Sequence, residues 1–296
     1  MSNLLKALDE DIFYGQFDGL VGSQELKKAF IEYLEANRDS VSINEFDTGN
    51  IFISSNLEYE SKNICKARKL LWFRGKEGNC LEKFKQYIAD SGNKGYKFIS
   101  TALSTGSYAK NNMLSELGFK YVNTKLLFSK EIKQIKKADK SIYRLEDTDF
   151  GYLQLKKIMR NAFKYSRFYN DRNISKKIAD NLYTDWLKAL IAKNHDIYVS
   201  VKEKEVAGFM VVDANHAPKF SSMKYGLMYF VLVDRKFLNQ QVGTNLLHFA
   251  EWQMLKMNIR YFLTNTQVTN LPAVKFYIKN GFYIHNSVNE YHWWGR

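Results

Sequence analysis

The sequence predicts an α/β (α+β) protein built from two similar halves, and two observations support this prediction. From Tyr143 onward the hydrophobic patterns follow the order strand, helix, helix, two strands, strand, helix, strand, helix, strand. A shift of roughly 163 positions also lays residues 101–119 on residues 264–282, with Thr, Gly and Phe matched. Because any helix-Gly-Phe-strand unit aligns in this way, chance similarity of the halves remains an alternative.

A boundary between the halves is expected near residue 140. The charged run from Lys130 to Lys140 is typical of a solvated linker, and a new strand pattern begins at Ser141. We therefore predict an N-terminal domain at 1–140 and a C-terminal domain at 141–296. A chain of 296 residues with 45% apolar side chains is long enough for two cores.

Each half has its own series of elements. In the first half we expect a strand at 96–100, a helix at 111–117 and a strand at 121–129. In the second half an acidic turn precedes a helix that ends near Phe163, where apolar residues recur at helical spacing. The later elements are a hairpin of 197–201 with 206–212, and an almost wholly apolar strand at 225–233.

Composition excludes several classes of protein. The formal charge of +13 favours polyanionic partners, but no recognition helix or aromatic strand motif accompanies it, so nucleic acid is not expected. Two cysteines, Cys65 and Cys80, form no metal-ligand pattern, so no metal is expected. No apolar run is long enough for a membrane span, and we expect a cytoplasmic protein. Monomer and homodimer both remain open.

The turn after the strand 225–233 is the first candidate site. We expect a helix from Asn245 to about Met257, and free backbone amides at a helix start can bind a pyrophosphate. The candidate phosphate-binding residues are Gln241, Val242, Gly243 and Thr244. By itself this turn is only weak evidence for a phosphate-binding site.

The stretch from Thr264 to Trp294 carries the second candidate site. A strand pattern leads into Asn270-Leu271-Pro272-Ala273, the next helix contains Phe276-Tyr277, and Gly281-Phe282 ends that helix. This strand, helix and strand closely resembles the last third of the GNAT acyltransferase fold.

The resemblance implies a GNAT fold with a mixed, mostly antiparallel sheet in the C-terminal domain, after a degenerate GNAT-like N-terminal domain. It implies acetyl-CoA or a longer acyl-CoA as co-substrate and an acyltransferase activity. Tyr277 would protonate the leaving thiolate, and the backbone of Val231 and Val233 would hydrogen-bond the pantetheine arm. Leu114 stands at the position of Tyr277 in the first half, so the chemistry is expected in the second half.

The match to the family pattern is incomplete. The family has Arg or Gln, two residues, Gly, one residue, and Gly or Ala, whereas this chain has Leu238 and Gln241 at the first two places and only Gly243 fits. A cradle of backbone amides does not need the missing side chains. Asn270 is expected to reach the pantetheine amides, and it fits equally well as the N-cap of a helix with Pro272 in its first turn.

Several other segments resemble the dTDP-fucosamine acetyltransferase family, whose members acylate the amine of nucleotide-linked amino sugars. The segments are Asp11–Gly15, Leu117–Thr124, Asn161–Asp171, Ala179–Trp186 and Thr266–Ala273. This resemblance implies a dTDP-linked amino-3,6-dideoxyhexose as the acyl acceptor.

The same resemblance implies a set of substrate-binding residues: Ser166, Arg167, Tyr169, Tyr183 and His292. A guanidinium suits a diphosphate because it offers two parallel donors. The alternative for Arg167 is a surface ion pair with Asp171. His292 is expected to contact substrate or relay a proton, and a packed or surface histidine is the alternative.

Two other functions remain open at this point. One is a non-catalytic acyl-CoA or nucleic-acid binding module, which the departures from the family pattern and the basic charge favour. The other is a protein or peptide N-acetyltransferase.

Overall fold

The computed structural model describes most of the chain after its first 30 residues. It describes residues 31–295 except for residues 33, 38, 48–49, 75–78, 134–140, 146–148, 161 and 217–224. The expectations for Asp11–Gly15, for the acidic turn at 146–148 and for most of the charged run lie outside the described residues. Lys130, at the start of that run, is not part of a solvated linker, because it lies in a strand and pairs with the buried Glu251.

The chain divides into two compact units. Unit 1 comprises Met1–Leu126, Ser166–Ile178 and His285–Arg296, and unit 2 comprises Leu127–Tyr165 and Ala179–Ile284. This grouping differs from the predicted domains 1–140 and 141–296, because the C-terminal strand pairs with a strand of unit 1. That the chain consists of two similar halves, 1–140 and 141–296, stays a prediction.

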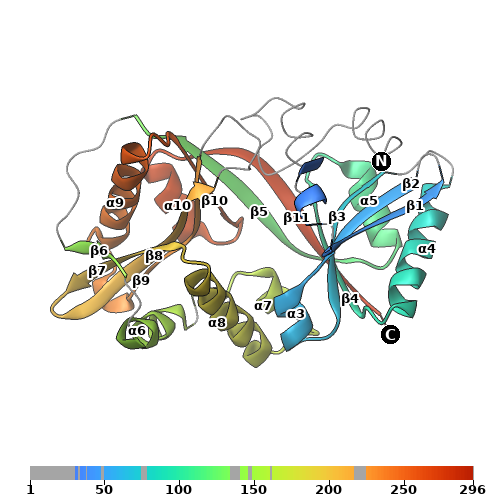
Figure 1. Cartoon of the computed structure of the whole chain (residues 1–296), viewed down its shortest axis with the longest axis horizontal. Coiled ribbons are helices and arrows are strands. Elements are labelled where there is room, and N and C mark those ends of the chain that lie inside the picture. The colour runs from blue at the N-terminus through green and yellow to red at the C-terminus, as the bar shows by residue number, and fades with distance from the viewer. Residues whose placement is uncertain are drawn as a thin grey trace. The chain divides into compact units, whose positions relative to one another are not determined.

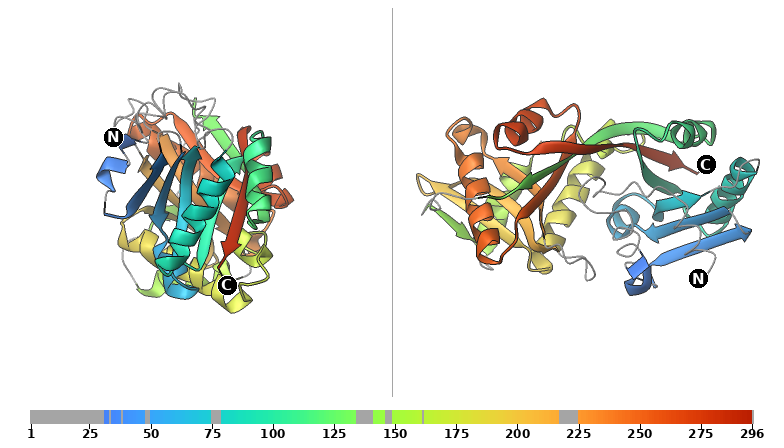
Figure 2. Two further views of the ribbon diagram at one scale, coloured as in Figure 1. Left: turned by 90° about the vertical axis from the view of Figure 1, so that its right-hand side faces the viewer. Right: turned by 90° about the horizontal axis from the view of Figure 1, so that it is seen from above.

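Unit 1 is built on a sheet with two of its α-helices packed against the apolar face. Its strand order is β1 (Val41–Asp47), β2 (Asn50–Asn56), β3 (Ala67–Arg74), β4 (Phe98–Ser104), β11 (Tyr283–Trp294) and β5 (Lys120–Glu131). Its helices are α3 (Glu58–Asn63), α4 (Cys80–Asn93), α5 (Tyr108–Glu116) and α7 (Arg167–Asn170). Phe52, Phe84, Leu114 and Tyr291 belong to the core between the sheet and the helices α4 and α5, which lie over these strands in Figure 2, left. The strands β5 and β11 have residues in both units.

Unit 2 holds the remaining elements. Its strand order is β5, β10 (Tyr261–Gln267), β9 (Tyr225–Val233), β8 (Glu205–His216), β7 (Asp196–Lys202) and β6 (Ile142–Arg144). Its helices are α6 (Asp149–Met159), most of α8 (Lys176–Ala192), the short 3-10 helix η1 (Arg235–Phe237), α9 (Val242–Lys256) and α10 (Leu271–Lys279).

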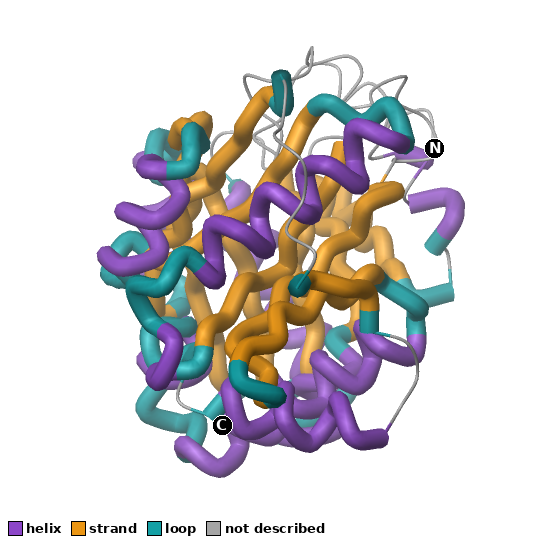
Figure 3. Tube along the Cα trace, turned by 90° about the vertical axis from the view of Figure 1, so that its left-hand side faces the viewer, coloured by secondary structure: helices purple, strands orange, loops and turns teal. Residues whose placement is uncertain are grey.

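Helices cover both faces of the unit 2 sheet (Figures 1 and 3). On one face, Val199, Phe209 and Phe230 pack against α6 and α8. On the other face, Tyr198 contacts Phe249 of α9, with 5.1 Å between the ring centroids. Side chains alternate between the faces of a strand, so the apolar residues of both faces explain why these strands lack a polar side.

The predicted order of elements from Tyr143 onward is observed, with two short additions, α7 of 4 residues and η1 of 3 residues. Several boundaries differ: α6 ends at Met159 instead of near Phe163, β8 continues to His216 instead of residue 212, and β4 covers 98–104 instead of 96–100. The helix α9 begins at Val242 instead of Asn245, because Gln241 has a left-handed conformation with φ of 61°. Its carbonyl then accepts the amide of Asn245 at 2.8 Å, which closes the first helical turn earlier than the sequence pattern suggests.

Candidate active site

The strands β9 and β10 are paired only near their N-terminal ends. Their parallel register runs from Tyr261 opposite Tyr225 to Leu263 opposite Leu227. At the next position the hydroxyl of Thr264 donates to the carbonyl oxygen of Met228 at 3.1 Å. No pairing of β9 with β10 is recorded farther along in the described residues, although β9 continues to Val233. The two strands therefore form a fork that opens beyond Thr264.

The predicted backbone ligands lie on the open part of this fork. Val231 and Val233 are half-buried, and on their other side they pair with Met210 and Gly208 of β8. A linear ligand placed in the fork could use the remaining backbone groups of β9 as an added strand does.

Tyr277 lies at the point where the fork begins. Its side chain is 4% exposed, and the centroids of Phe128 and Phe282 lie 5.2 and 5.7 Å from its ring. Burial raises the pKa of Tyr277 to about 12, and a hydrogen bond with the Thr264 side chain opposes that rise. The phenol is therefore protonated at neutral pH.

The first turn of α9 supplies backbone donors. The first backbone bond into the helix is made by Asn245, so the amides of Val242, Gly243 and Thr244 precede the intrahelical ladder. A β-carbon on Gly243 would lie 3.2 Å from Cε2 of Phe276. Glycine thus allows the start of α9 to approach α10 closely, and the amides and helix dipole there suit a pyrophosphate.

Asn270 stands at the N-cap position of α10, but its side chain makes no capping hydrogen bond. Instead its amide nitrogen donates to the hydroxyl of Thr266 at 3.0 Å. The side chain is thereby held against β10. The capping role predicted for Asn270 is therefore not observed, and its role in binding pantetheine stays a prediction.

The predicted substrate residues do not all belong to one unit. Ser166, Arg167, Tyr169 and His292 lie in unit 1, whereas Tyr183 lies in unit 2. The Tyr183 ring stacks on Phe163 with centroids 4.0 Å apart, and it packs against the core of unit 2.

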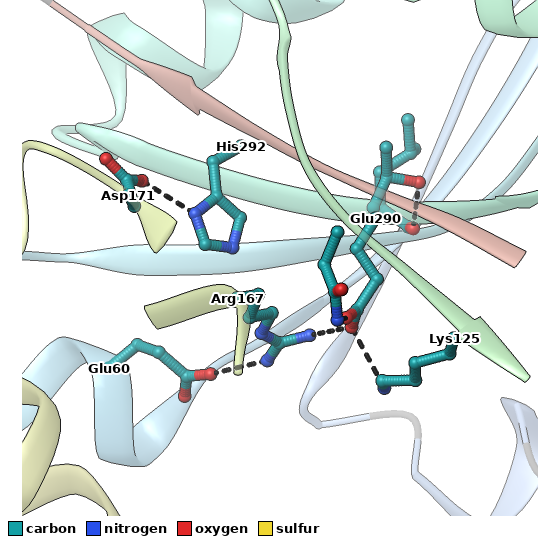
Figure 4. Close-up of polar contacts among 9 residues, drawn as sticks. Glu60, Lys125, Arg167, Asp171, Glu290 and His292 are labelled. Carbon is teal, nitrogen blue, oxygen red and sulfur yellow. Dashed lines mark hydrogen bonds and ion pairs between the residues drawn. The ribbon is translucent and has the colours of Figure 1, made fainter. Parts of the chain in front are cut away.

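In unit 1, Arg167 lies between two carboxylates (Figure 4). Its guanidinium is 3.0 Å from Glu290 and 3.2 Å from Glu60. Glu290 also accepts from Lys125 at 2.9 Å and from Asn123 at 3.1 Å. Burial alone would raise the pKa of Glu290, but Lys125 and Arg167 outweigh it and lower the pKa to about 2.

Asp171 binds a different partner from the one that the surface-pair alternative expects. Its carboxylate lies 2.7 Å from Nδ1 of His292 and accepts the indole N–H of Trp294 at 2.9 Å. His292 is fully buried, with the Phe98 ring edge-on at 4.7 Å. Burial lowers the pKa of His292, whereas hydrogen bonds from His292, Asn173 and Trp294 outweigh burial and lower the pKa of Asp171. A neutral imidazole that donates from Nδ1 to a carboxylate fits both shifts.

Sequence reasoning missed four residues that shape these sites: Glu60, Lys69, Lys125 and Thr264. The available signal was alternation on the last strand, where Glu290, His292 and Trp294 share one face. A row of polar and aromatic side chains on a buried strand indicates partners on neighbouring strands.

The described residues contain neither a candidate metal site nor a candidate membrane-spanning helix. No group of three or more His, Cys, Asp and Glu side chains there could hold a metal ion. None of the helices in those residues has both the length and the apolar character needed to cross a membrane.

Comparisons with known proteins agree with this architecture. Residues 156–282 match the family model described as the acetyltransferase (GNAT) family. No curated protein matches the chain.

Solved structures show the same fold over nearly the whole chain. A tandem GNAT protein from the clavulanic acid biosynthesis pathway superposes with a TM-score of 0.59 at 9% identity, covering 98% of this chain and 93% of that one. A GCN5-related N-acetyltransferase from Sphaerobacter thermophilus gives 0.55 at 10% identity, covering 92% and 85%. A similar protein from Kribbella flavida gives 0.55 at 8% identity, covering 90% and 96%.

At these identities the structures establish the fold alone, and the family match covers residues 156–282. Three observations agree with a GNAT fold: the sheet is mixed but mostly antiparallel, β9 and β10 form a fork, and the segment 156–282 matches the family model. The chain therefore has the α+β GNAT fold, and its segment 156–282 is similar to the acetyltransferase (GNAT) family.

Proposed function

We propose that the protein transfers an acyl group from acyl-CoA to the amine of a dTDP-linked amino-3,6-dideoxyhexose. The observation that carries the acyl-transfer part is the position of Tyr277, whose hydroxyl meets Thr264 where β9 and β10 separate. The acceptor is supported by the sequence resemblance of Asn161–Asp171 and Ala179–Trp186 to the dTDP-fucosamine acetyltransferase family. The roles of Ser166, Arg167, Tyr169, Tyr183 and His292 in binding that acceptor belong to the same proposal, as does a cytoplasmic location.

In this mechanism the co-substrate lies in the fork of unit 2. The amides of Gln241–Thr244 bind the pyrophosphate, the backbone of Val231 and Val233 and the Asn270 side chain bind the pantetheine arm, and the thioester lies near Tyr277. Acetyl-CoA and hydroxybutyryl-CoA are both candidate donors.

The reaction is a direct attack in a ternary complex. The sugar amine attacks the thioester carbonyl, the C–S bond breaks, and the thiolate takes its proton from Tyr277, which regains one from solvent. The attacking nitrogen loses a proton as the amide forms. A sugar amine is less basic than a lysine of pKa about 10.4, so a strong general base is not required.

The test is to incubate acetyl-CoA and hydroxybutyryl-CoA separately with dTDP-linked 3-amino and 4-amino sugars. Thiol release and a gain of one acyl group in the nucleotide sugar are expected, and dTDP-glucose, which has no amine, should give neither. Acylation of peptides in place of sugars would indicate a protein acetyltransferase. Salt-sensitive binding to random duplex DNA without thiol release from any acyl-CoA would indicate a binding module.

A further inference from the structure

Unit 1 contains a fork of its own between two parallel strands. The register of β3 and β4 ends where Leu70 lies opposite Thr101. No pairing of these strands is recorded farther along in the described residues, although both strands continue beyond this pair. The hydroxyl of Thr101 donates to the carbonyl oxygen of Leu70 at 2.9 Å, as the hydroxyl of Thr264 donates to Met228 in unit 2. Each unit thus has a fork that opens beyond a threonine.

The strands β3 and β9 have the same irregularity at the start of their forks. Each carries a bulge one residue after the carbonyl that accepts from the threonine, at Leu71 in β3 and at Tyr229 in β9. In both strands the neighbouring antiparallel strand skips the bulged residue. Counted from the same carbonyl, Phe73 of β3 corresponds to Val231 of β9, a residue assigned above to the pantetheine arm.

The helices beside the two forks also correspond residue by residue. Both α5 and α10 are 9 residues long. Each is followed at the same distance by a glycine with positive φ, Gly118 at 83° and Gly281 at 84°. Counted back from these glycines, Lys110 of α5 corresponds to Ala273 of α10.

The side chain of Lys110 fills part of the unit 1 fork. Its ammonium group donates to the carbonyl oxygen of Phe73 at 3.3 Å. The same group lies 5.3 Å from the centroid of the Phe73 ring, close enough for a cation–π interaction. Burial raises the pKa of the Cys80 thiol, and the charge of Lys110 opposes that rise, so the ammonium also lies near the first residue of α4.

Unit 2 lacks this contact because its corresponding residue is short. The side chain of Ala273 ends at its β-carbon and cannot span the fork. The backbone of Val231 is therefore left for a ligand, whereas in unit 1 a side chain of the protein already uses the equivalent carbonyl.

We propose that Lys110 is an internal plug of the unit 1 fork, which takes the place of a pantetheine arm and limits the chain to one acyl-CoA. The inference rests on the proposed function, because that function places the pantetheine arm at Val231. An acyl-CoA that entered unit 1 would have to displace a charged donor. That donor is tethered beside its acceptor, so it competes at a high effective concentration.

Calorimetric titration of the full chain with CoA counts the sites. Wild type should bind one CoA per chain, and Lys110→Ala should bind two, because the Phe73 carbonyl is then free to accept an amide of the arm. Lys110→Arg, which keeps a cation of similar reach, should bind one. Lys85→Ala removes an exposed lysine of α4 that pairs with Glu82; it is the matched control and should also bind one.

The reciprocal variant in unit 2 makes the test independent of the folding of unit 1. Ala273→Lys should weaken CoA binding by at least about tenfold, because the new ammonium can reach Val231 as Lys110 reaches Phe73. Ile278→Lys adds the same charge at an exposed position of α10 and should leave the affinity unchanged.

The outcomes separate the plug from the proposed function. Two sites in wild type, one site in a Lys110→Ala protein that unfolds cooperatively in urea, or full affinity in Ala273→Lys would each overturn the plug alone. No CoA binding by wild type and by every variant would overturn the plug and the proposed function together.

Discussion

At the scale of single residues, two buried side chains have opposite charge states: Tyr277 is neutral and Glu290 is ionised. The phenol of Tyr277 is surrounded by aromatic rings, so burial keeps it neutral and its pKa rises to about 12. Glu290 is equally buried, but Lys125 and Arg167 keep it charged with a pKa of about 2. The difference is the presence of a cation within hydrogen-bond distance, because an unpaired buried charge would cost several kcal/mol.

Replacing Tyr277 by phenylalanine should lower kcat for thiol release by about 100-fold, the lower end of the range for a positioned acid. The lower end is expected because a phenol with pKa of about 12 is a weaker acid than an ordinary thiol of pKa about 8.5. Affinity for CoA, measured by calorimetry, should not change. Tyr283→Phe, which removes an exposed hydroxyl from β11, serves as the control, and equal rates in the two variants would exclude Tyr277 from the reaction.

Glu290→Gln should destabilise the protein by about 3–5 kcal/mol at pH 7, because it leaves Arg167 and Lys125 without their shared partner. The folded-state pKa of Glu290 lies below the unfolded value, so its contribution is complete above about pH 4.5 and is lost as pH falls toward 2. Urea unfolding should therefore show the gap between wild type and variant narrowing over that interval. Glu82→Gln, which breaks the exposed pair with Lys85, should change stability by less than about 1 kcal/mol at any pH.

At the scale of elements, the start of α9 is set by two residues with left-handed backbone, Asn239 and Gln241, each with φ of 61°. Gln241 occupies the place where the family pattern has its first glycine. A left-handed glutamine costs about 1–2 kcal/mol, whereas asparagine tolerates this conformation better. The structure thus gives a physical reason for glycine at that place, which the sequence alone showed only as a departure.

Gln241→Gly should stabilise the protein by about 0.5–1 kcal/mol, because the relieved strain exceeds the about 0.5–1 kcal/mol of chain entropy that glycine adds. Affinity for CoA should be kept, since the cradle consists of backbone amides. Thermal unfolding and calorimetry measure the two quantities. Asn239→Gly is the matched control and should give little or no gain, so an equal gain at both positions would contradict the strain argument.

The approach of β8 to β9 is a second feature of the fork. A β-carbon on Gly208 would lie 2.7 Å from the carbonyl oxygen of Leu232 and 2.9 Å from a methyl group of Val242. Both contacts are closer than packed atoms allow, and one of them involves rigid backbone.

Gly208→Ala should therefore destabilise the protein by about 1–3 kcal/mol, and it should weaken CoA binding because Leu232 and Val242 border the fork. Gly92→Ala in α4 meets nothing within 4 Å and should be neutral or stabilising by up to about 1 kcal/mol. Urea unfolding and CoA titration of both variants test the difference. Normal CoA binding by Gly208→Ala would show that the fork tolerates a movement of β8 away from β9.

At the scale of the whole molecule, local patterns predicted the elements well but did not reveal their partners. The apolar run gave β9 with its correct bounds, Tyr225–Val233, and the Asn-x-Pro motif gave the start of α10 at Leu271. The pairing of β11 with β4 joins residues such as His292 and Ser100, which are far apart in the chain. Periodicity contains no information on such contacts, and so the buried network around Arg167 could not be predicted.

A fragment of residues 1–140 should fail to fold, although it has the length of a domain, because it lacks the β11 segment that pairs with β4. Circular dichroism and urea unfolding should show no cooperative transition. Joining residues 285–296 to the fragment through a flexible linker should restore at least part of the transition. A cooperative transition in the fragment alone would support an autonomous N-terminal domain.

The position of β11 also matters while the protein is being made. The strand β11 comes long after β4 in the chain, so the ribosome must synthesise residues 105–282 before β4 can pair with it. Until then β4 presents an open edge, the kind of surface through which nascent chains aggregate. A stop codon anywhere between β4 and β11 would consequently leave β4 unpaired on this side, although β1 to β4 are made earlier.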